Sequence, residues 1–220
     1  MGLHDNQPVV YAGAVLDQSD AVMIMIHGRG AGPQGILGLA TEFNRPRFAC
    51  IAPSAALHTW YPFSFMSPRE KNEPGLSSAL SVIEGLVADL LKRGRKAHKI
   101  VLVGFSQGAC LSTEFVIRHP QHYGGLLAYS GGLIGPPGTT WDDVPSLRSG
   151  QPLLGGMPIF LGCSDIDPHI PKERVIESEA VFNRLGARVT RRLYPGMGHL
   201  VNEDEIAEGQ KVLDQVLAAP

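Results

Sequence analysis

An apolar run that ends in a serine between two glycines is the feature that most restricts how this chain can fold. Residues 101–108 read Val-Leu-Val-Gly-Phe-Ser-Gln-Gly, and a helical pattern follows directly. Gly104 and Gly108 lie two residues to either side of Ser106, where a sharp turn leaves no room for a Cβ. A glycine-rich loop with an incidental serine is the alternative, since a chain with 26 glycines can match by chance. The strand–turn–helix context favours a nucleophile elbow that exposes the Ser106 hydroxyl.

Apolar runs typical of buried strands alternate with helical patterns along the chain. Such alternation builds a mostly parallel sheet with helices on both faces, so the fold class is α/β. Strands are predicted at residues 9–15, 21–27, 48–52, 99–103, 126–130, 158–162 and 188–194. Helices are predicted at residues 35–44, 77–92, 109–117, 172–185 and 203–218. No linker-like stretch divides the sequence, and residues 1–220 are therefore expected to form a single domain.

Composition excludes several classes of function. The net charge is −2 and 44% of the residues are hydrophobic, which leaves no basic face for nucleic acid. No apolar run approaches the ~20 residues that span a bilayer, and residues 1–7 lack the features of a signal peptide. We therefore expect a cytoplasmic protein without a membrane span. Its three cysteines, Cys50, Cys110 and Cys163, are expected to stay reduced.

A second glycine-rich loop, at residues 27–32, follows the apolar run 21–26. It reads His-Gly-Arg-Gly-Ala-Gly. Next to a nucleophile elbow, an H-G-x-G loop donates one backbone N–H to an oxyanion hole, and the residue after the nucleophile donates another. These donors would be Arg29 and Gln107, and His27 is expected to be structural. A phosphate-binding loop is the alternative, but neither its Lys-Ser or Lys-Thr pair nor the dinucleotide-binding fingerprint is present.

The elbow also requires a histidine base and a carboxylate that orients it, in the chain order serine, acid, histidine. His199 lies in a glycine-rich turn after the last predicted strand, where such a base belongs. His169 is the weaker candidate, since it lies beside the acids and leaves no strand end with a carboxylate in the expected order. The acid is expected after the strand that begins at residue 158, where Asp165 and Asp167 compete and spacing does not separate them.

A cation site formed by Asp165, Asp167 and His169 is a further alternative for the same loop. The glycine turn and the terminal glutamate of a calcium loop are absent from this segment. We therefore expect no metal and no cofactor.

Together these motifs resemble the phospholipase/carboxylesterase family of α/β-hydrolases, which includes the acyl-protein thioesterases. The resemblance covers nearly the whole chain, through the motifs at residues 26–28, 104–108 and 196–199. The G-F-S-Q-G form at the elbow is more specific than G-x-S-x-G. The resemblance implies the α/β-hydrolase fold, with a mostly parallel central sheet and helices on both faces.

The resemblance also implies the roles of individual residues. Ser106 corresponds to the nucleophile and His199 to the base. The family acid lies in a D-P-x-[VI]-P segment, which residues 167–171 match, so the resemblance selects Asp167. By the same comparison, the backbone N–H groups of Arg29 and Gln107 form the oxyanion hole.

Several apolar residues are candidates for a substrate pocket. Family members carry a tryptophan–aromatic pair, which Trp60 and Tyr61 match. Phe63 and Phe65 follow in the same loop, and Leu133 lies in a later one. These side chains could wall an acyl pocket, and core packing beneath a long loop is the alternative.

Departures from the thioesterase pattern narrow the activity that the resemblance implies. The thioesterase branch shows H-G-L-G-D at residues 27–31, C-H-G-D near residues 161–165 and an aspartate in place of Pro62. The chain therefore looks more like a bacterial carboxylesterase that hydrolyses small soluble esters through an acyl-enzyme. A lysophospholipase, an acyl-protein thioesterase and a catalytically silent hydrolase-fold binding protein are the alternatives. Dienelactone hydrolase is disfavoured, since that relative has a cysteine at the elbow where Ser106 stands.

One long segment, residues 131–156, is rich in glycine and proline. We expect it to be either a flap over the site or a surface loop. The expected partner is a small-molecule ester, and a homodimer is compatible with the sequence.

Overall fold

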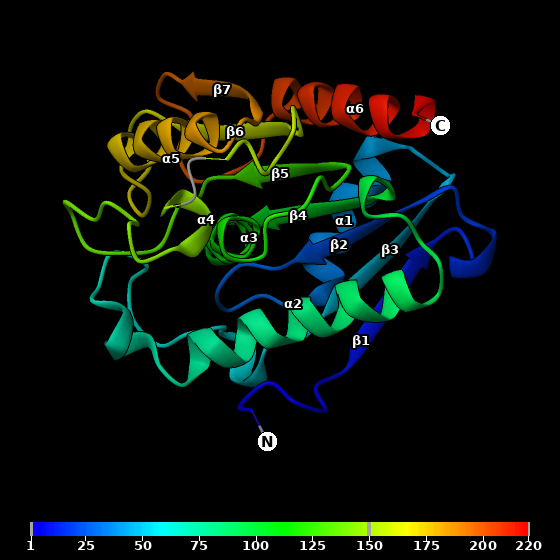
Figure 1. Cartoon of the computed structure of the whole chain (residues 1–220), viewed down its shortest axis with the longest axis horizontal. Helices are drawn as coiled ribbons and strands as arrows, with labels where there is room; N and C mark the ends of the chain where they lie inside the picture. The colour runs from blue at the N-terminus through cyan, green and yellow to red at the C-terminus, as the bar shows by residue number, and fades with distance from the viewer. Residues whose placement is uncertain (1, 149–150, 220) are drawn as a thin grey trace.

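One seven-stranded sheet organises the computed structural model, which describes residues 2–148 and 151–219 (Figure 1). The strands lie in the order β1-β3-β2-β4-β5-β6-β7. Only the edge strand β1 (Val9–Gly13) is antiparallel, and it pairs with β3 (Phe48–Pro53). The parallel strands are β2 (Ala21–Ile26), β3, β4 (Ile100–Phe105), β5 (Gly125–Tyr129), β6 (Pro158–Ser164) and β7 (Arg188–Tyr194). The expected mostly parallel sheet is confirmed.

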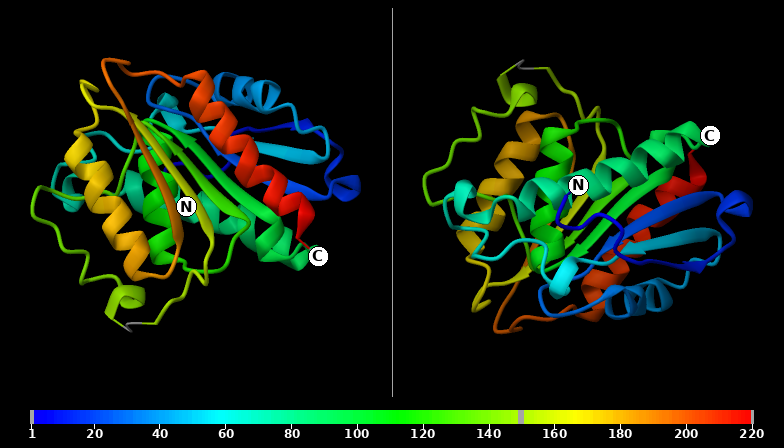
Figure 2. Two further views of the ribbon diagram at one scale, coloured as in Figure 1. Left: turned by 90° about the horizontal axis from the view of Figure 1, so that it is seen from above. Right: turned by 90° about the horizontal axis from the view of Figure 1, so that it is seen from below.

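Helices cover both faces of this sheet (Figures 1 and 2). One face packs against α1 (Pro33–Phe43) and α6 (Glu203–Ala218). The other packs against α2 (Gly75–Lys92), α3 (Gln107–Arg118) and α5 (Lys172–Arg184). A short helix α4 (Pro145–Arg148) and the 3-10 turns at Leu16–Gln18, Ala56–His58, Arg69–Asn72 and Ala97–Lys99 complete the described elements. None of the described helices is long and apolar enough to cross a membrane.

The inner strand β2 shows why these sequences form a sheet covered on both sides. All six of its residues are buried. Successive side chains of a strand point to opposite faces, so Val22 and Ile24 join the core beneath α2, α3 and α5. Met23 and Met25 join the core beneath α1 and α6. Burial of each such side chain contributes roughly 1.5–3 kcal/mol, which is why an unbroken apolar run is stable here.

Parallel strands end at the same edge of the sheet, and this places the motif-bearing loops together. The loops that follow β2, β3, β4, β6 and β7 all leave from that edge. In α/β sheets the ligand site lies outside the carboxyl ends of the strands. The fold therefore brings segments near residues 28, 60, 106, 167 and 199 to one region.

The segment that starts at residue 131 is packed into the core over its first part. The buried guanidinium of Arg174 donates to the carbonyl oxygens of Leu133 at 2.7 Å, Gly135 at 2.8 Å and Pro136 at 3.1 Å. It also lies 5.2 Å from the ring centroid of Trp141. The buried cation of Arg174 thus satisfies three backbone carbonyl groups. Residues 131–135 are buried, so this first part of the segment is not a surface loop, and it is joined to α5 through Arg174. Residues 149–150 of the segment lie outside the described residues.

Replacing Arg174 by methionine should therefore destabilise the protein strongly. The variant removes the donor for three carbonyl groups, and unsatisfied buried polar groups cost about 3 kcal/mol or more in total. Arg184→Met is the matched control, because Arg184 is exposed on the same helix and pairs only loosely with Asp142, at 3.8 Å. Surface changes of that kind stay within about 0.5 kcal/mol. Urea denaturation measures both variants, and equal losses would contradict the role given to Arg174.

Candidate active site

Ser106 lies at a sharp bend between β4 and α3. Its backbone has φ 55° and ψ −120°, a conformation that few non-glycine residues adopt. A Cβ at Gly104 would overlap the carbonyl group of Gly108, and a Cβ at Gly108 would overlap the carbonyl oxygen of Ile26. The two glycines therefore allow α3 to approach the ends of β4 and β2 closely. The bend places the half-buried Ser106 side chain at the edge of the sheet, where it lines a cavity.

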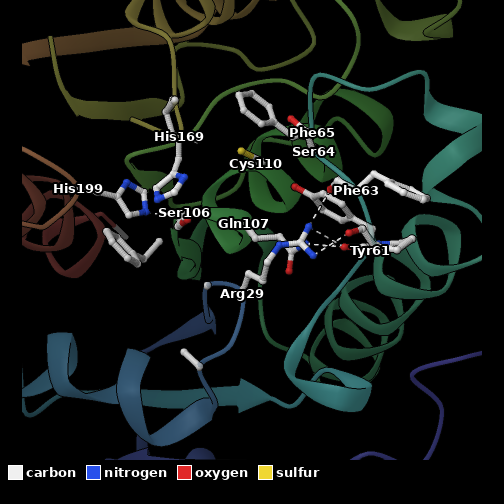
Figure 3. Close-up of a pocket in the computed structure, with 15 residues that line it drawn as sticks. Arg29, Tyr61, Phe63, Ser64, Phe65, Ser106, Gln107, Cys110, His169 and His199 are labelled. Atoms are coloured by element: carbon white, nitrogen blue, oxygen red, sulfur yellow. Dashed lines mark hydrogen bonds between the residues drawn. The ribbon is translucent and has the colours of Figure 1, made fainter. Parts of the chain in front are cut away.

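Three side chains from distant parts of the chain form one hydrogen-bonded series. His199 Nε2 lies 2.9 Å from Ser106 Oγ, and His199 Nδ1 lies 2.7 Å from Asp167 Oδ2. Figure 3 shows His199 directed at Ser106. The ring of Phe105 packs against His199, with the ring centroids 4.9 Å apart. The expected base thus lies within hydrogen-bonding distance of both the expected nucleophile and the expected acid.

The environment of Asp167 keeps this carboxyl ionised. Its side chain is completely buried, and burial, the largest single effect, raises its pKa. The hydrogen bond and the charge of His199 lower the pKa, as do hydrogen bonds from the backbone N–H groups of His169 at 2.8 Å and Ile170 at 3.0 Å. These contributions together outweigh burial, and the pKa of Asp167 lies below its ordinary value.

Asp165, which spacing alone leaves open as the acid, has a different partner. Its Oδ1 accepts a hydrogen bond from the backbone N–H of Gly196 at 2.8 Å. Ser164 Oγ accepts another from Gly198 at 3.1 Å. Both glycines have positive φ, 66° and 83°, in the turn that leads to His199. Asp165 therefore holds the loop of the histidine, whereas Asp167 contacts the imidazole itself.

The loop with the expected oxyanion donor is held by His58, which lies in a turn of left-handed backbone. Leu57 and His58 have φ values of 51° and 57°. The carbonyl oxygen of His58 accepts a hydrogen bond from Gly30 N–H at 2.7 Å, and its Nδ1 lies 2.9 Å from the carbonyl oxygen of Ala31. Strained backbone of this kind costs roughly 1–3 kcal/mol and persists where the surrounding contacts fix it. These contacts fix the backbone around Arg29.

His27 is structural, as expected. Its Nε2 accepts from the backbone N–H of Ala55 at 3.1 Å, so Nδ1 carries the proton and donates to the carbonyl oxygen of Gly28 at 2.8 Å. Burial lowers the pKa of His27 below its ordinary value. The ring is therefore neutral, and it braces the start of the glycine-rich loop.

The side chains of Arg29 and Gln107 have a role that the sequence motifs did not reveal. The Arg29 guanidinium donates to the carbonyl oxygens of Tyr61 at 2.9 Å, Pro62 at 2.9 Å and Phe63 at 2.7 Å (Figure 3). The Gln107 side-chain amide donates to the same Tyr61 carbonyl oxygen at 2.8 Å, and its Oε1 accepts from the backbone N–H of Trp60 at 2.9 Å. Both side chains therefore fasten the aromatic loop to the elbow region.

A cavity of about 530 Å³ opens beside Ser106. Tyr61, Phe63 and Phe65 line it, as expected, and Cys110 contributes to its wall without any signal in the sequence (Figure 3). Further residues along its surface are Gly28, Arg29, Ala31, Pro62, Ser64, Phe105, Gln107, His169, Ile170 and His199. The volume falls in the ordinary range for small-molecule sites.

Two residues expected in this pocket lie elsewhere. Trp60 is fully buried and donates from Nε1 to the carbonyl oxygen of His27 at 2.9 Å. Leu133 is also fully buried, and its backbone N–H donates to Ser178 Oγ at 2.9 Å. Both side chains belong to the core that packs beneath α2, α3 and α5. The alternative of core packing applies to these two positions.

A family model described as Phospholipase/Carboxylesterase matches residues 6–217. The chain belongs to the phospholipase/carboxylesterase family. The crystal structure of a phospholipase/carboxylesterase from Dyadobacter fermentans superposes with a TM-score of 0.88 at 34% identity, covering 99% of each chain. The α/β-hydrolase fold is therefore confirmed.

More distant relatives have esterase and thioesterase names. Acyl-protein thioesterase 1 of Debaryomyces hansenii is 25% identical, over 96% of this chain and 97% of the relative. The Bacillus cereus carboxylesterase shares the fold with a TM-score of 0.71 at 17% identity, over 96% of this chain and 95% of that structure. The chain is accordingly an esterase- or thioesterase-type hydrolase of the phospholipase/carboxylesterase family.

Glu205 is a second buried carboxyl near the site. It lies in the first turn of α6, shortly after His199. Its Oε2 accepts from Asn202 N–H at 2.9 Å, and Asn202 Oδ1 accepts from Glu205 N–H at 2.9 Å. Oε1 is buried without a partner among the described residues. Burial raises the pKa of Glu205 to about 7. Between the ordinary pKa and about 7 the folded protein binds a proton that the unfolded chain releases, so stability falls as pH rises through this window.

Replacing Glu205 by glutamine should remove this pH dependence, because the amide oxygen retains the cap without ionising. As the pH rises from 5 to 8, the free energy of unfolding of wild type should fall by roughly 1–3 kcal/mol more than that of E205Q. Glu203→Gln is the control, since Glu203 is exposed in the same helical turn. Denaturant titrations over the pH series measure the difference, and parallel curves for E205Q and wild type would refute the assignment.

Proposed function

We propose that the chain is a serine carboxylesterase that hydrolyses small soluble carboxylic esters through an acyl-enzyme. The observation that supports this most directly is the hydrogen-bonded series from Asp167 through His199 to Ser106, at 2.7 and 2.9 Å. A neutral imidazole in this position accepts the hydroxyl proton as the oxygen attacks a carbonyl carbon. The buried carboxylate holds the imidazole tautomer and stabilises the imidazolium that forms.

The reaction then divides into two balanced halves. Ser106 Oγ bonds to the carbonyl carbon, and its proton passes to His199 Nε2. The proton next goes to the leaving alcohol oxygen as the ester bond breaks, which leaves an acyl-enzyme. Water attacks this intermediate, again giving its proton to His199, and the acid is released as the proton returns to Ser106.

Backbone N–H groups of Arg29 and Gln107 are proposed to bind the developing oxyanion. Gln107 is the first residue of α3, where N–H groups lack helical partners and the helix dipole favours negative charge. Among the described residues, neither N–H donates to another protein group. Both segments are fastened through their side chains to the aromatic loop, so the donors are held before substrate binds.

The cavity supports a small ester as the substrate. Its volume, about 530 Å³, fits a compact acyl group, and Tyr61, Phe65 and Cys110 supply an apolar wall. Lysophospholipase or acyl-protein thioesterase activity is the second candidate, favoured by the relatives named for thioesterase activity. A panel of esters graded by acyl length separates them, since the second candidate requires activity that rises with long acyl chains.

Replacing Ser106 by alanine should abolish ester turnover while the fold is retained. Ala lacks the oxygen that forms the acyl-enzyme, so kcat should fall by about 10⁴-fold or more. A fluorophosphonate probe should label the wild type at Ser106 and leave S106A unlabelled. Near-normal turnover by purified S106A would overturn the proposal, and an unlabelled wild type without turnover would favour a silent binding protein.

Asp167→Asn should lower kcat by roughly 10³–10⁴-fold, because a neutral amide neither fixes the productive tautomer nor stabilises the imidazolium. Asp165→Asn is the matched control. Its amide oxygen can still accept from Gly196 N–H, so the loss should stay within about tenfold. Steady-state kinetics on one short-chain ester measures both, and the reverse order of effects would transfer the acid role to Asp165.

A further inference from the structure

A second depression lies next to the catalytic serine, on the side of α1. It is a groove of about 330 Å³. The groove shares Gly28, Ala31 and Phe105 with the larger cavity, so the two depressions meet near Ser106. Its apolar lining comes from Ala31, Ile36, Leu39, Phe105 and Val201, with Gly35 at the surface.

His199 and His169 line one end of the larger cavity, and the groove opens next to that end. Figure 3 shows His199 on one side of Ser106 and the cavity wall with Tyr61, Phe65 and Cys110 on the other. The groove belongs to the His199 side. Phe105, which lines it, packs against the imidazole with ring centroids 4.9 Å apart, and Val201 follows His199 by two residues.

The chemistry of ester cleavage distinguishes these two sides. The leaving oxygen must receive its proton from His199 Nε2, so the alcohol portion of the ester faces the imidazole in the transition state. The acyl portion then points away from His199, toward the end of the larger cavity walled by Tyr61, Phe65 and Cys110. We propose that the groove along α1 binds the alcohol portion of the substrate, an inference that rests on the serine esterase mechanism above.

The lining defines the chemical class of this alcohol. The groove contains no charged side chain, because its one titratable residue, His27, is buried and its pKa is lowered. Ile36, Leu39 and Val201 offer only apolar surface. A volume near 330 Å³ lies at the lower end of small-molecule sites. The groove therefore suits a short alkyl or single-ring alcohol and disfavours a charged headgroup, for which it provides no counter-charge.

Gly35 allows the groove to be filled without disturbing the core. Gly35 is an exposed residue in the first turn of α1, and a Cβ there would meet only the Ala31 side chain, at 4.0 Å. A leucine at this position covers the groove. Leucine also has a higher helix propensity than glycine, so Gly35→Leu should fold. Gly38→Leu is the matched control, because Gly38 is exposed on the same helix, has nothing within 4 Å and does not line the groove.

Two series of esters test the proposal by their kcat/KM values, which report acylation. The first is acetate esters of methanol to butanol, and the second is methyl esters of acetic to hexanoic acid. Wild type and G38L should gain about two- to fourfold in kcat/KM per methylene in the alcohol series, the rate equivalent of burying a CH₂. In G35L the butyl-to-methyl ratio should fall by about tenfold, while the slope of the acyl series stays as in wild type.

Each alternative outcome has a defined meaning. Loss of the acyl slope in G35L would place the acyl group in the groove and overturn the proposal, as would a flat alcohol series in wild type. Equal losses in G35L and G38L would assign the effect to α1 in general and would also overturn it. If wild type cleaves no ester in either series, the proposed esterase function is wrong. If wild type cleaves the esters but its kcat/KM does not depend on the alcohol, only the role of the groove is wrong.

Discussion

The close approach of α3 to the ends of β4 and β2 is the constraint on which the site depends. It exists only because Gly104 and Gly108 lack a Cβ, since either methyl group would occupy the position of a backbone carbonyl. The same approach sets Ser106 at an unusual φ and brings the start of α3 against the end of β2. The absence of a Cβ at two glycines thus positions the expected nucleophile and the expected oxyanion donors together.

Polar side chains around the elbow then fasten backbone to backbone. Arg29 joins three carbonyl oxygens of the aromatic loop, and Asp165 holds a glycine N–H in the turn before His199. Farther away, Arg174 performs a similar task for the segment that begins at residue 131. A hydrogen bond between a charged side chain and backbone restrains a loop at one point, and several together restrain its conformation. These hydrogen bonds hold the loops at the edge of the sheet in the fixed conformation that a catalytic site requires.

The sequence predicted those parts of the structure that depend on periodicity and on local turn chemistry. The strands of the sheet, the elbow at Ser106 and the structural role of His27 all follow from such patterns. Spacing did not separate Asp165 from Asp167, since their difference lies in which distant group each one meets. Likewise, Trp60 and Leu133 have the apolar character of pocket residues. Contacts with residues distant in the sequence, His27 and Ser178, hold them in the core instead of the cavity. Long-range side-chain contacts of this kind leave no periodic signal.

Two buried carboxyl groups near the site show how local donors decide ionisation. Both Asp167 and Glu205 lose solvent, and burial alone would raise both pKa values. Asp167 has donors at both oxygens, from His199, His169 and Ile170, and its pKa is lowered. Glu205 has one backbone donor at Oε2 and none among the described residues at Oε1, and its pKa is raised to about 7. Asp167 therefore stays charged and can orient a histidine, whereas Glu205, with a donor at one oxygen only, keeps its proton up to about pH 7.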